Sequence, residues 1–377
     1  MARILYGVMG NTNGHLARVQ AVIQRLPEHE FYFVGGGRVP ETLRDQYPVL
    51  EVPVARTVYR RQRAMVWATI GHLTRCVVGF PAVQRRIRDT IESWQPDLAI
   101  CDREFYIPHA ARQAGLKVFS LDHSHVLQVC QYPVPADQMF SWSLSRVEDK
   151  LFFDWTNHNL VTSFFHPPVS RRRGRTELLP AVIRRTVRDF TPSTGDYIFV
   201  YQTAPTFGAL IEVLRQLRRP AIVYGYRQEK VVEGNITFKP FDKRGILEDL
   251  AGCAYAVVNG GHNLICEALY FGKPLLCFPL AVCFEQYINA YHVRELGFGD
   301  FSTSRQPTPA LFAGMEARLL EYRRNIAREF RDGTDVVTER VRELIREYSL
   351  TGQQIPEKKG IGCSRGGGDR LGEVRSG

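Results

Sequence analysis

One stretch of the chain combines a glycine turn, polar side chains and a carboxylate at the spacing expected of a ligand-binding helix start. It covers residues 259–274 and reads NGGHNLICEALYFGKP. The apolar residues before it predict a buried strand, Gly260 and Gly261 predict a turn, and Asn263 is expected to be the N-cap of a helix. The free N–H groups and the positive dipole end of such a helix suit a phosphate or diphosphate without a lysine or a metal.

Further polar residues near this helix start suit the hydroxyl groups of a sugar attached to the phosphate. Glu267 follows Asn263 by four residues and so lies near the same helix face, one turn deeper, where its carboxylate can accept hydrogen bonds from ribose hydroxyls. Glu285 and Gln286 follow the next apolar run and can hold a second polyhydroxylated group. The pattern therefore predicts a nucleotide sugar as ligand. The alternative is an ordinary βαβ turn with a satisfied helix cap.

These residues resemble the donor-binding signature of glycosyltransferases with the GT-B fold, in particular the bacterial inverting enzymes related to MurG and the UDP-glycosyltransferases. The resemblance implies two Rossmann-like domains facing across a cleft, a UDP-sugar donor and transfer with inversion. It also implies that His262 and Asn263, beside the glycine turn, contact the donor. The matching residues are Gly260, Gly261, Glu267, Gly272, Pro274, Glu285, Gln286 and Asn289.

The start of the chain offers a candidate general base. An apolar strand over residues 4–8 leads into the loop MGNTNGH, and an amphipathic helix follows to about Leu26. His15 is expected at the helix start, where the dipole keeps the imidazole neutral and able to take a proton from an acceptor hydroxyl. The loop resembles the glycine-rich opening of the same enzymes, although it is poorer in glycine. On this resemblance Gly14 belongs to the donor site and Asn13 to the acceptor site.

Acidic and imidazole groups follow two further strands at the same expected sheet edge. Asp102 and Glu104 come after one strand, and His123 comes after the next. Asp102 is expected to orient His15 and stabilise its charged form. Glu104 is a second catalytic candidate, and His123 is expected to bind the acceptor, although either is also an alternative base. The competing interpretation is that Asp102 and Asp122 cap the helices that follow them.

Two features of the second half support a nucleotide there. Thr203 lies just after the strand at residues 197–201, where its hydroxyl can meet a diphosphate. Phe241 lies in a loop at residues 239–244 that resembles the base-binding loop of the same family. It is expected to pack beside a uracil-type base, and the alternative is that it belongs to the core.

Short β-rich runs alternate with helical patterns along the whole chain, which predicts an α/β protein of two tandem, doubly wound, parallel-sheet domains. A Pro, Ser and Gly cluster at residues 190–196 marks the boundary. We expect an acceptor-binding domain over residues 1–190 and a nucleotide-sugar-binding domain over 196–348, whose last helices pack back on the first domain. Residues 351–377 are rich in Gly, Lys, Arg and Ser and are expected to be disordered. The expected strands lie at residues 4–8, 31–34, 98–101, 118–121, 160–162, 197–201, 221–224, 236–239, 254–258 and 275–278.

The formal net charge of +10 points to an anionic partner. Arginines gather at residues 60–63, 85–88, 171–175 and 184–185. The first cluster precedes an apolar, Trp-containing segment, which fits the surface of an anionic membrane and the presentation of a lipid acceptor. The alternative is a helix that buries its apolar face and solvates its arginines. Nucleic acid is not an expected partner, because no zinc-finger, RNA-recognition or helix-turn-helix pattern accompanies the charge.

The amino-acid composition of the 377-residue chain indicates a soluble globular protein. No bound cofactor is expected. The eight cysteines lack metal-type pairing and are expected to be buried thiols, and no Asp-x-Asp motif predicts a metal. A signal peptide and an apolar run of membrane-spanning length are both missing, so a cytoplasmic location is expected, at most peripheral to the inner face of the membrane.

Three other functions compete with glycosyl transfer. A UDP-sugar epimerase resembles the same fold but differs in its opening motif, and Gly14-His15 with Glu285-Gln286 favours transfer. A non-enzymatic basic protein that binds anionic lipid or nucleic acid is the second. A nicotinamide-dependent dehydrogenase is disfavoured, since no Gly-x-Gly-x-x-Gly follows the first strand. The acceptor stays open among glycans, lipids and small molecules.

Overall fold

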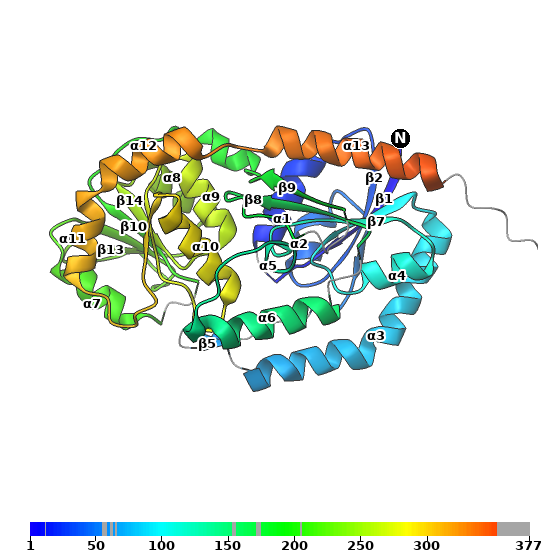
Figure 1. Cartoon of the computed structure of the whole chain (residues 1–377), viewed down its shortest axis with the longest axis horizontal. Helices are drawn as coiled ribbons and strands as arrows, with labels where there is room; N and C mark the ends of the chain where they lie inside the picture. The colour runs from blue at the N-terminus through cyan, green and yellow to red at the C-terminus, as the bar shows by residue number, and fades with distance from the viewer. Residues whose placement is uncertain are drawn as a thin grey trace, which may run out of the picture.

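Two α/β domains lie side by side along the long axis of the protein (Figure 1). The computed structural model describes residues 1–11, 13–54, 59–60, 63–64, 66–152, 156–170, 175–203 and 206–352. Each domain is built on a seven-stranded sheet with the strand order of a doubly wound fold. The prediction of two tandem doubly wound domains is therefore confirmed.

The first sheet is parallel throughout, in the order β3-β2-β1-β6-β7-β8-β9. Its central strands are apolar runs that are buried on both faces, as parallel strands between helices must be. Ile4 and Tyr6 of β1 pack into one apolar cluster, whereas Leu5 packs into another on the opposite face. The strands are β1 (Arg3–Val8), β2 (Glu30–Gly35), β3 (Val49–Glu51), β6 (Leu98–Asp102), β7 (Val118–Asp122), β8 (His158–Ser163) and β9 (Arg175–Pro180).

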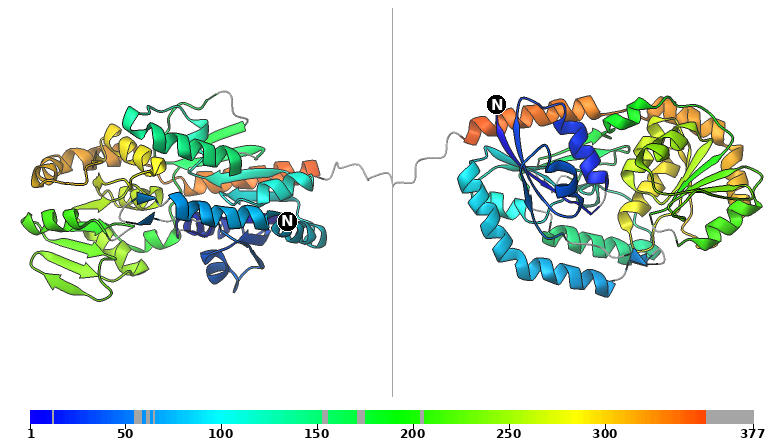
Figure 2. Two further views of the ribbon diagram at one scale, coloured as in Figure 1. Left: turned by 90° about the horizontal axis from the view of Figure 1, so that it is seen from below. Right: turned by 180° about the vertical axis from the view of Figure 1, so that it is seen from behind.

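Helices cover both faces of this sheet (Figure 2). Side chains of α1, α2 and the last helix, α13 (Thr334–Gly352), complete the cluster that contains Ile4, and those of α3 and α4 complete the cluster that contains Leu5. A two-stranded hairpin, β4 (Tyr59–Arg60) and β5 (Arg63–Ala64), precedes α3. The helices are α1 (Asn13–Ile23), α2 (Arg38–Leu43), α3 (Val66–Trp94), α4 (Ile107–Gln113), α5 (Val126–Val129), η1 (Ala136–Gln138), α6 (Met139–Phe152) and η2 (Arg185–Asp189).

The second sheet has the order β12-β13-β11-β10-β14-β15-β16 and is parallel except for β12. Helices α7, α11 and α12 cover one face, and α8, α9 and α10 cover the other. The strands are β10 (Ile198–Tyr201), β11 (Ala221–Tyr224), β12 (Val231–Glu233), β13 (Ile236–Lys239), β14 (Tyr255–Val258), β15 (Leu275–Cys277) and β16 (Gly299–Phe301). The helices are α7 (Gly208–Gln216), α8 (Lys243–Gly252), α9 (His262–Tyr270), α10 (Phe284–Glu295), α11 (Pro309–Ala317), α12 (Leu319–Glu329) and α13 (Thr334–Gly352).

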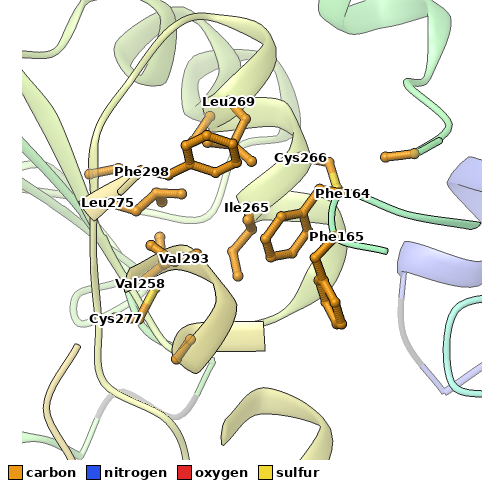
Figure 3. Packing of buried hydrophobic residues seen from close by; sticks show 14 of the residues in the cluster. Phe164, Phe165, Val258, Ile265, Cys266, Leu269, Leu275, Cys277, Val293 and Phe298 are labelled. Carbon is orange, nitrogen blue, oxygen red and sulfur yellow. The ribbon is translucent and has the colours of Figure 1, made fainter. Parts of the chain in front are cut away.

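One apolar cluster joins the two domains. Phe164 and Phe165 follow β8 of the first domain, and Figure 3 shows them beside Ile265 and Cys266 of α9 in the second. The ring of Phe165 also stacks on His292 of α10, with the ring centroids 4.0 Å apart. Since these rings are shared, the carboxyl edges of the two sheets are held close together.

A short segment connects the first domain to the second. Helix η2 ends at Asp189 and β10 begins at Ile198, with the Pro, Ser and Gly cluster between them. The ammonium group of Lys273, which is 3% exposed, donates to the carbonyl oxygens of Ser193 and Cys253 and so ties the linker to the second domain.

The last helix, α13, crosses back to the first domain (Figure 1). Val337, Val341 and Leu344 belong to the same apolar cluster as α1 and β1. The last helix of the predicted second domain, residues 196–348, therefore packs in the apolar core of the first domain. The expected disordered tail lies outside the described residues from 353 onward.

Only parts of the predicted basic clusters can be placed. Arg85, Arg86 and Arg88 lie exposed on α3. The side chains of the cluster at 60–63 and of the apolar segment at 64–70 lie outside the described part, as do residues 171–174. Among the helices of the described ranges, none is long and apolar enough to cross a membrane. The cysteines of these ranges are free thiols, and all but Cys283 are buried, as expected.

Candidate active site

The carboxyl ends of β1 and β6 bring His15 and Asp102 together. Val8 pairs with Asp102 in the sheet, and the N–H of Met9 donates to the Asp102 carbonyl at 3.0 Å. The loop then enters α1 at Asn13, so His15 lies in the first turn of the helix. Its Nδ1 is 2.7 Å from Oδ1 of Asp102, whose side chain is fully buried, while 16% of the His15 side chain stays exposed. The expected proximity of this pair is thus observed.

A third member of this group, Arg18, was not predicted from the sequence. It lies one turn after His15 in α1 and is 5% exposed. Its guanidinium donates to both carboxylate oxygens of Asp102, at 3.0 and 2.6 Å. The Asp102 carboxylate therefore holds a histidine and an arginine of α1, which is not the helix-cap role of the competing interpretation.

Glu104 has the contacts of a helix cap. Its Oε2 accepts hydrogen bonds from the N–H groups of Tyr106 and Ile107 at the start of α4, at 2.8 and 2.7 Å. The side chain is 4% exposed, and burial raises the pKa of its carboxyl to about 7 against the opposition of these N–H groups. This geometry fits a cap better than the expected catalytic carboxylate, although Glu104 also borders a pocket with Val8, Met9 and Phe105.

His123 joins the domains and does not fit the expected acceptor-binding role. It is 3% exposed, and both ring nitrogens are engaged, with the carbonyl oxygen of Thr162 at 3.0 Å and Oδ1 of Asn289 at 2.8 Å. Asn289 in turn donates to the carbonyl oxygen of Gly260 at 3.0 Å. Burial lowers the pKa of His123, and Glu285 and the contacts with Asn289 and Thr162 oppose this effect.

Asp122 has a local role, as the alternative interpretation expected. Its carboxylate accepts hydrogen bonds from the main-chain N–H of His125 at 2.9 Å and pairs with the His125 ring at 2.5 Å. Burial opposes ionisation of this carboxyl, but His125 outweighs it and holds the pKa of Asp122 well below its usual range. Asn13 is the first residue of α1, but its side chain lies outside the described part.

The glycine turn of the second domain leads directly into α9. Gly260 has a φ of 125°, and a Cβ on it would lie 2.6 Å from the carbonyl oxygen of Gln286, so only glycine fits. The N-cap of α9 is Gly261, and not Asn263 as predicted, since the helix starts at His262. A Cβ on Gly261 would meet nothing within 4 Å, so space is open beside the first N–H groups of the helix.

Asn259 fixes the geometry of this turn. Its amide group donates to Oε1 of Gln202 at 2.7 Å and to the carbonyl oxygen of Phe278 at 3.0 Å. Its Oδ1 accepts from the N–H of Thr203 at 2.6 Å. Thr203 is thus adjacent to the turn, and its exposed side chain lies at the same sheet edge.

Glu267 already has a strong partner. Arg184, from the start of η2, donates from Nε and Nη2 to its two carboxylate oxygens at 2.6 and 3.0 Å. Only 8% of the Glu267 side chain and 24% of the Arg184 side chain are exposed. Burial raises the pKa of Glu267 and the guanidinium opposes this rise. Arg184 was predicted only as a member of a basic cluster.

Glu285 and Gln286 begin α10 and face different partners. Oε2 of Glu285 accepts a hydrogen bond from the hydroxyl of Ser124 in the first domain at 2.6 Å. Burial raises the pKa of Glu285, but His123 and Arg103 outweigh it and lower the pKa overall. Oε1 of Gln286 accepts from the N–H of Leu280 at 3.0 Å, which shapes the loop before α10.

Phe241 and His262 complete the predicted donor residues. Phe241 is 47% exposed, with its ring centroid 6.4 Å from that of Tyr201, so it is not a core residue. His262 is 6% exposed and stacks on the ring of His123 with centroids 3.7 Å apart. Burial and the neighbouring His123 lower the pKa of His262 well below its usual range.

The two halves of the candidate site therefore face one another. His15, Asp102 and Arg18 lie at the edge of the first sheet, and the amino end of α9 lies at the edge of the second. The charge of Arg18 contributes to the lowered pKa of His262 across the domain contact. Among the described residues, no group of three or more His, Cys, Asp or Glu side chains could hold a metal ion.

Comparison with known proteins decides the family. The model of Glycosyl transferase family 1 matches residues 2–312. The chain belongs to this family. A comparison with curated proteins found no match.

Solved structures show that this glycosyltransferase has the GT-B fold. MurG of Acinetobacter baumannii aligns over 92% of this chain and 100% of its own, with a TM-score of 0.59 and 13% identity. Phytolacca americana UGT2, complexed with UDP-2fluoro-glucose and pterostilbene, aligns over 93% and 100%, with a TM-score of 0.65 and 13% identity. The calicheamicin glycosyltransferase CalG4 aligns over 94% and 100%, with a TM-score of 0.63 and 16% identity.

Proposed function

We propose that this glycosyltransferase moves a sugar from a UDP sugar to an acceptor hydroxyl, with inversion and without a divalent metal. The observation that carries the proposal is the juxtaposition of His15, held by Asp102, with the open amino end of α9 in the other domain. The first arrangement suits a base and the second suits a leaving diphosphate. Glycosyl transfer to a hydroxyl needs both.

His15 would be the general base. Its Nδ1 faces Asp102, so Nε2 is the nitrogen that takes the acceptor proton. The acceptor oxygen then attacks the anomeric carbon on the face opposite the diphosphate, which inverts the configuration. The N–H groups of the first turn of α9 receive the charge that develops on the diphosphate, and donors of this kind contribute about 3 kcal/mol each to transition-state binding.

The donor would lie along the edge of the second sheet. The exposed ring of Phe241 provides a flat apolar surface for a uracil-type base. Glu267 would accept hydrogen bonds from the ribose, and Glu285 and Gln286 would accept them from the sugar. The similarity of the fold to the UGT2 that was complexed with UDP-2fluoro-glucose supports uridine over other nucleosides.

Binding to a panel of nucleotides tests the donor. UDP and UDP sugars should raise the Tm more than dTDP or GDP and their sugars, because only a bound species stabilises the fold, by about 2.7 kcal/mol at a hundredfold excess over Kd. Glu267→Gln should reduce this shift, whereas Glu248→Gln, at an exposed position of α8, should keep it.

Product analysis tests the reaction. UDP should be released only when a hydroxyl acceptor is added, and EDTA should leave the rate unchanged. Isomerised donor without release of UDP would identify an epimerase instead. Loss of activity in EDTA that Mg²⁺ restores would refute the metal-independent part of the proposal.

We also propose a peripheral association with the anionic, cytoplasmic face of a membrane. On α6, Phe140, Leu144 and Val147 are 66%, 41% and 56% exposed, and their spacing places them on one helix face. The net charge of +10 would attract anionic lipid to such a surface. Phe140→Ser with Val147→Ser should abolish flotation with vesicles of phosphatidylglycerol, and wild-type protein should not float with phosphatidylcholine alone. Equal flotation of wild type and variant would refute this surface.

A further inference from the structure

Arg18 occupies a position between the proposed base and its carboxylate. It follows His15 by three residues on α1, and its Nη2 lies 3.2 Å from Nδ1 of His15. The same Nη2 donates to Oδ1 of Asp102 at 2.6 Å, and Nε donates to Oδ2 at 3.0 Å. Oδ1 of Asp102 is therefore shared between the guanidinium and the imidazole, whose Nδ1 is 2.7 Å away.

The guanidinium decides the ionisation of this carboxyl group. Asp102 is 0% exposed, and a carboxyl buried alone prefers its neutral form. Two charge-assisted hydrogen bonds from Arg18 stabilise the carboxylate instead. Burial lowers the pKa of Arg18, but Asp102 outweighs this and raises it, so Arg18 stays charged.

The ionisation of Asp102 in turn decides the tautomer of His15. A carboxylate can only accept hydrogen bonds, so the proton of the His15–Asp102 contact must be on Nδ1, which leaves Nε2 free to act as base. A neutral Asp102 could donate to Nδ1 and would then leave the proton of the imidazole on Nε2. That tautomer cannot take a proton from an acceptor.

Arg18 also balances the charge that His15 feels. A carboxylate alone beside a histidine favours the imidazolium form, which is no longer a base. A fixed positive charge at 3.2 Å from Nδ1 opposes this effect. Arg18 thus opposes protonation of the ring that Asp102 contacts.

We propose that Arg18 is a positioning residue that keeps Asp102 ionised and His15 neutral in the Nδ1–H tautomer. The proposal rests on the proposed function, in which His15 is the base. Arg18 acts through Asp102 and His15, not through substrate.

Other charged or titratable groups face His15 and Arg18 and must be held constant in any test. Tyr6 of β1 and Asp122 of β7 interact electrostatically with Arg18. Glu285 of α10 interacts with His15, and His123 and His262 interact with Arg18. Substitutions at Arg18 leave all of these groups in place, so a change in titration reports the loss of the guanidinium.

The pH dependence of kcat/KM separates positioning from a merely structural role. In Arg18→Met the acid limb, which reports the base of the free enzyme, should move up by about one pH unit, because without the guanidinium the Asp102–His15 pair keeps an extra proton to higher pH. Whether that proton is on Asp102 or on the imidazole, Nε2 of His15 is then not free to act as base. Arg18→Lys restores the charge and should return the limb towards its wild-type position. An unchanged limb in Arg18→Met would overturn the proposal.

The chain contains a matched control. Arg340 of α13 donates to both oxygens of Glu177 at 2.7 Å, and Glu177 lies 2.8 Å from Nε2 of His158. Arg340→Met therefore removes an arginine from another arginine–carboxylate–histidine group, on β8, β9 and α13. It should lower the Tm but leave the acid limb in place.

A titration without substrate distinguishes failure of this proposal from failure of the proposed function. The ¹⁵N and ¹³C shifts of the His15 ring, assigned with His15→Gln, should show the Nδ1–H tautomer in wild type and a raised pKa in Arg18→Met. An Nε2–H tautomer in wild type, or equal pKa values in the two proteins, would refute the role of Arg18. Wild-type protein that shows these ring shifts but transfers no sugar would refute only the proposed function.

Discussion

Replacing Glu104 by glutamine removes a buried charge while keeping its hydrogen-bond acceptor. The side chain is 4% exposed, and its Oε2 accepts from two N–H groups at the start of α4. The amide oxygen of glutamine can accept the same two bonds. Glu104→Gln therefore isolates the cost of ionising this carboxyl group in the core.

The size and pH range of the effect follow from the pKa. Burial raises the pKa of Glu104 from 4.5 to about 7, so the folded state binds more protons than the unfolded state between these values. Its contribution to stability is fully present below pH 4.5 and is lost as the pH rises through about 7. The raised pKa corresponds to about 3 kcal/mol once the carboxyl is ionised. Glu104→Gln has no ionisable group at this position and so does not lose this stability as the pH rises.

Urea unfolding at a series of pH values measures the prediction. The free energy of unfolding of Glu104→Gln, relative to wild type, should rise by about 3 kcal/mol from about pH 4.5 to about pH 8. Glu229→Gln, at an exposed position, is the control and should show little change with pH. A difference between Glu104→Gln and wild type that is flat with pH, or that falls, would refute the reasoning.

Three further predictions concern the domain contact and the base. His15→Ala should lower kcat by about 10² to 10⁴, the usual contribution of a general base, with the Kd for UDP sugar in calorimetry nearly unchanged. Gly260→Ala should lower stability by more than about 1 kcal/mol in thermal unfolding and weaken UDP-sugar binding, because alanine disfavours a φ of 125° and its Cβ would meet Gln286. Burial lowers the pKa of the stacked His123 and His262 below 6.5. Their contribution to stability is therefore present above that pH and is lost as the pH falls. Hydrogen exchange in α9 should accordingly rise below about pH 6.5.

Each of these has a control and an opposing outcome. Unchanged turnover in His15→Ala would show that another group is the base. Gly272→Ala, at a φ of 68° with open space around it, should cost less than Gly260→Ala, and equal losses would remove the steric argument. His123→Gln should weaken the acid response of α9, and an identical response in this variant would assign it to other groups.

The fold could be predicted because each of its central strands is a short apolar run in the sequence. Each strand expected from the sequence overlaps an observed strand, since parallel strands buried on both faces need such runs. The sequence prediction missed edge strands because they are not buried on both faces and therefore need no such apolar run. β9 reads RTELLP and β12 reads VVE, and their pairing is set by the neighbouring strand more than by their own pattern.

The site could be predicted only where chain geometry alone brings residues together. Asp102 ends β6 and His15 follows β1 at the same sheet edge, so their contact follows from the topology. Arg184 and Glu267 are 83 residues apart, and His123 and Asn289 are 166 apart. Those pairs depend on how the two domains dock, which no local pattern encodes.

The contacts of the two candidate donor carboxylates differ in how readily a ligand can replace them. Glu285 accepts one hydrogen bond from the neutral hydroxyl of Ser124, and a sugar hydroxyl can substitute for it with little change in free energy. Glu267 is held by two charge-assisted bonds from Arg184, which ribose hydroxyls cannot match. In the proposed function a ribose would therefore bind to the remaining lone pairs of Glu267 with Arg184 still in place. Exchange at Glu285 also releases Ser124 of the first domain, so recognition of the sugar is coupled to the domain contact, whereas recognition of the ribose is not.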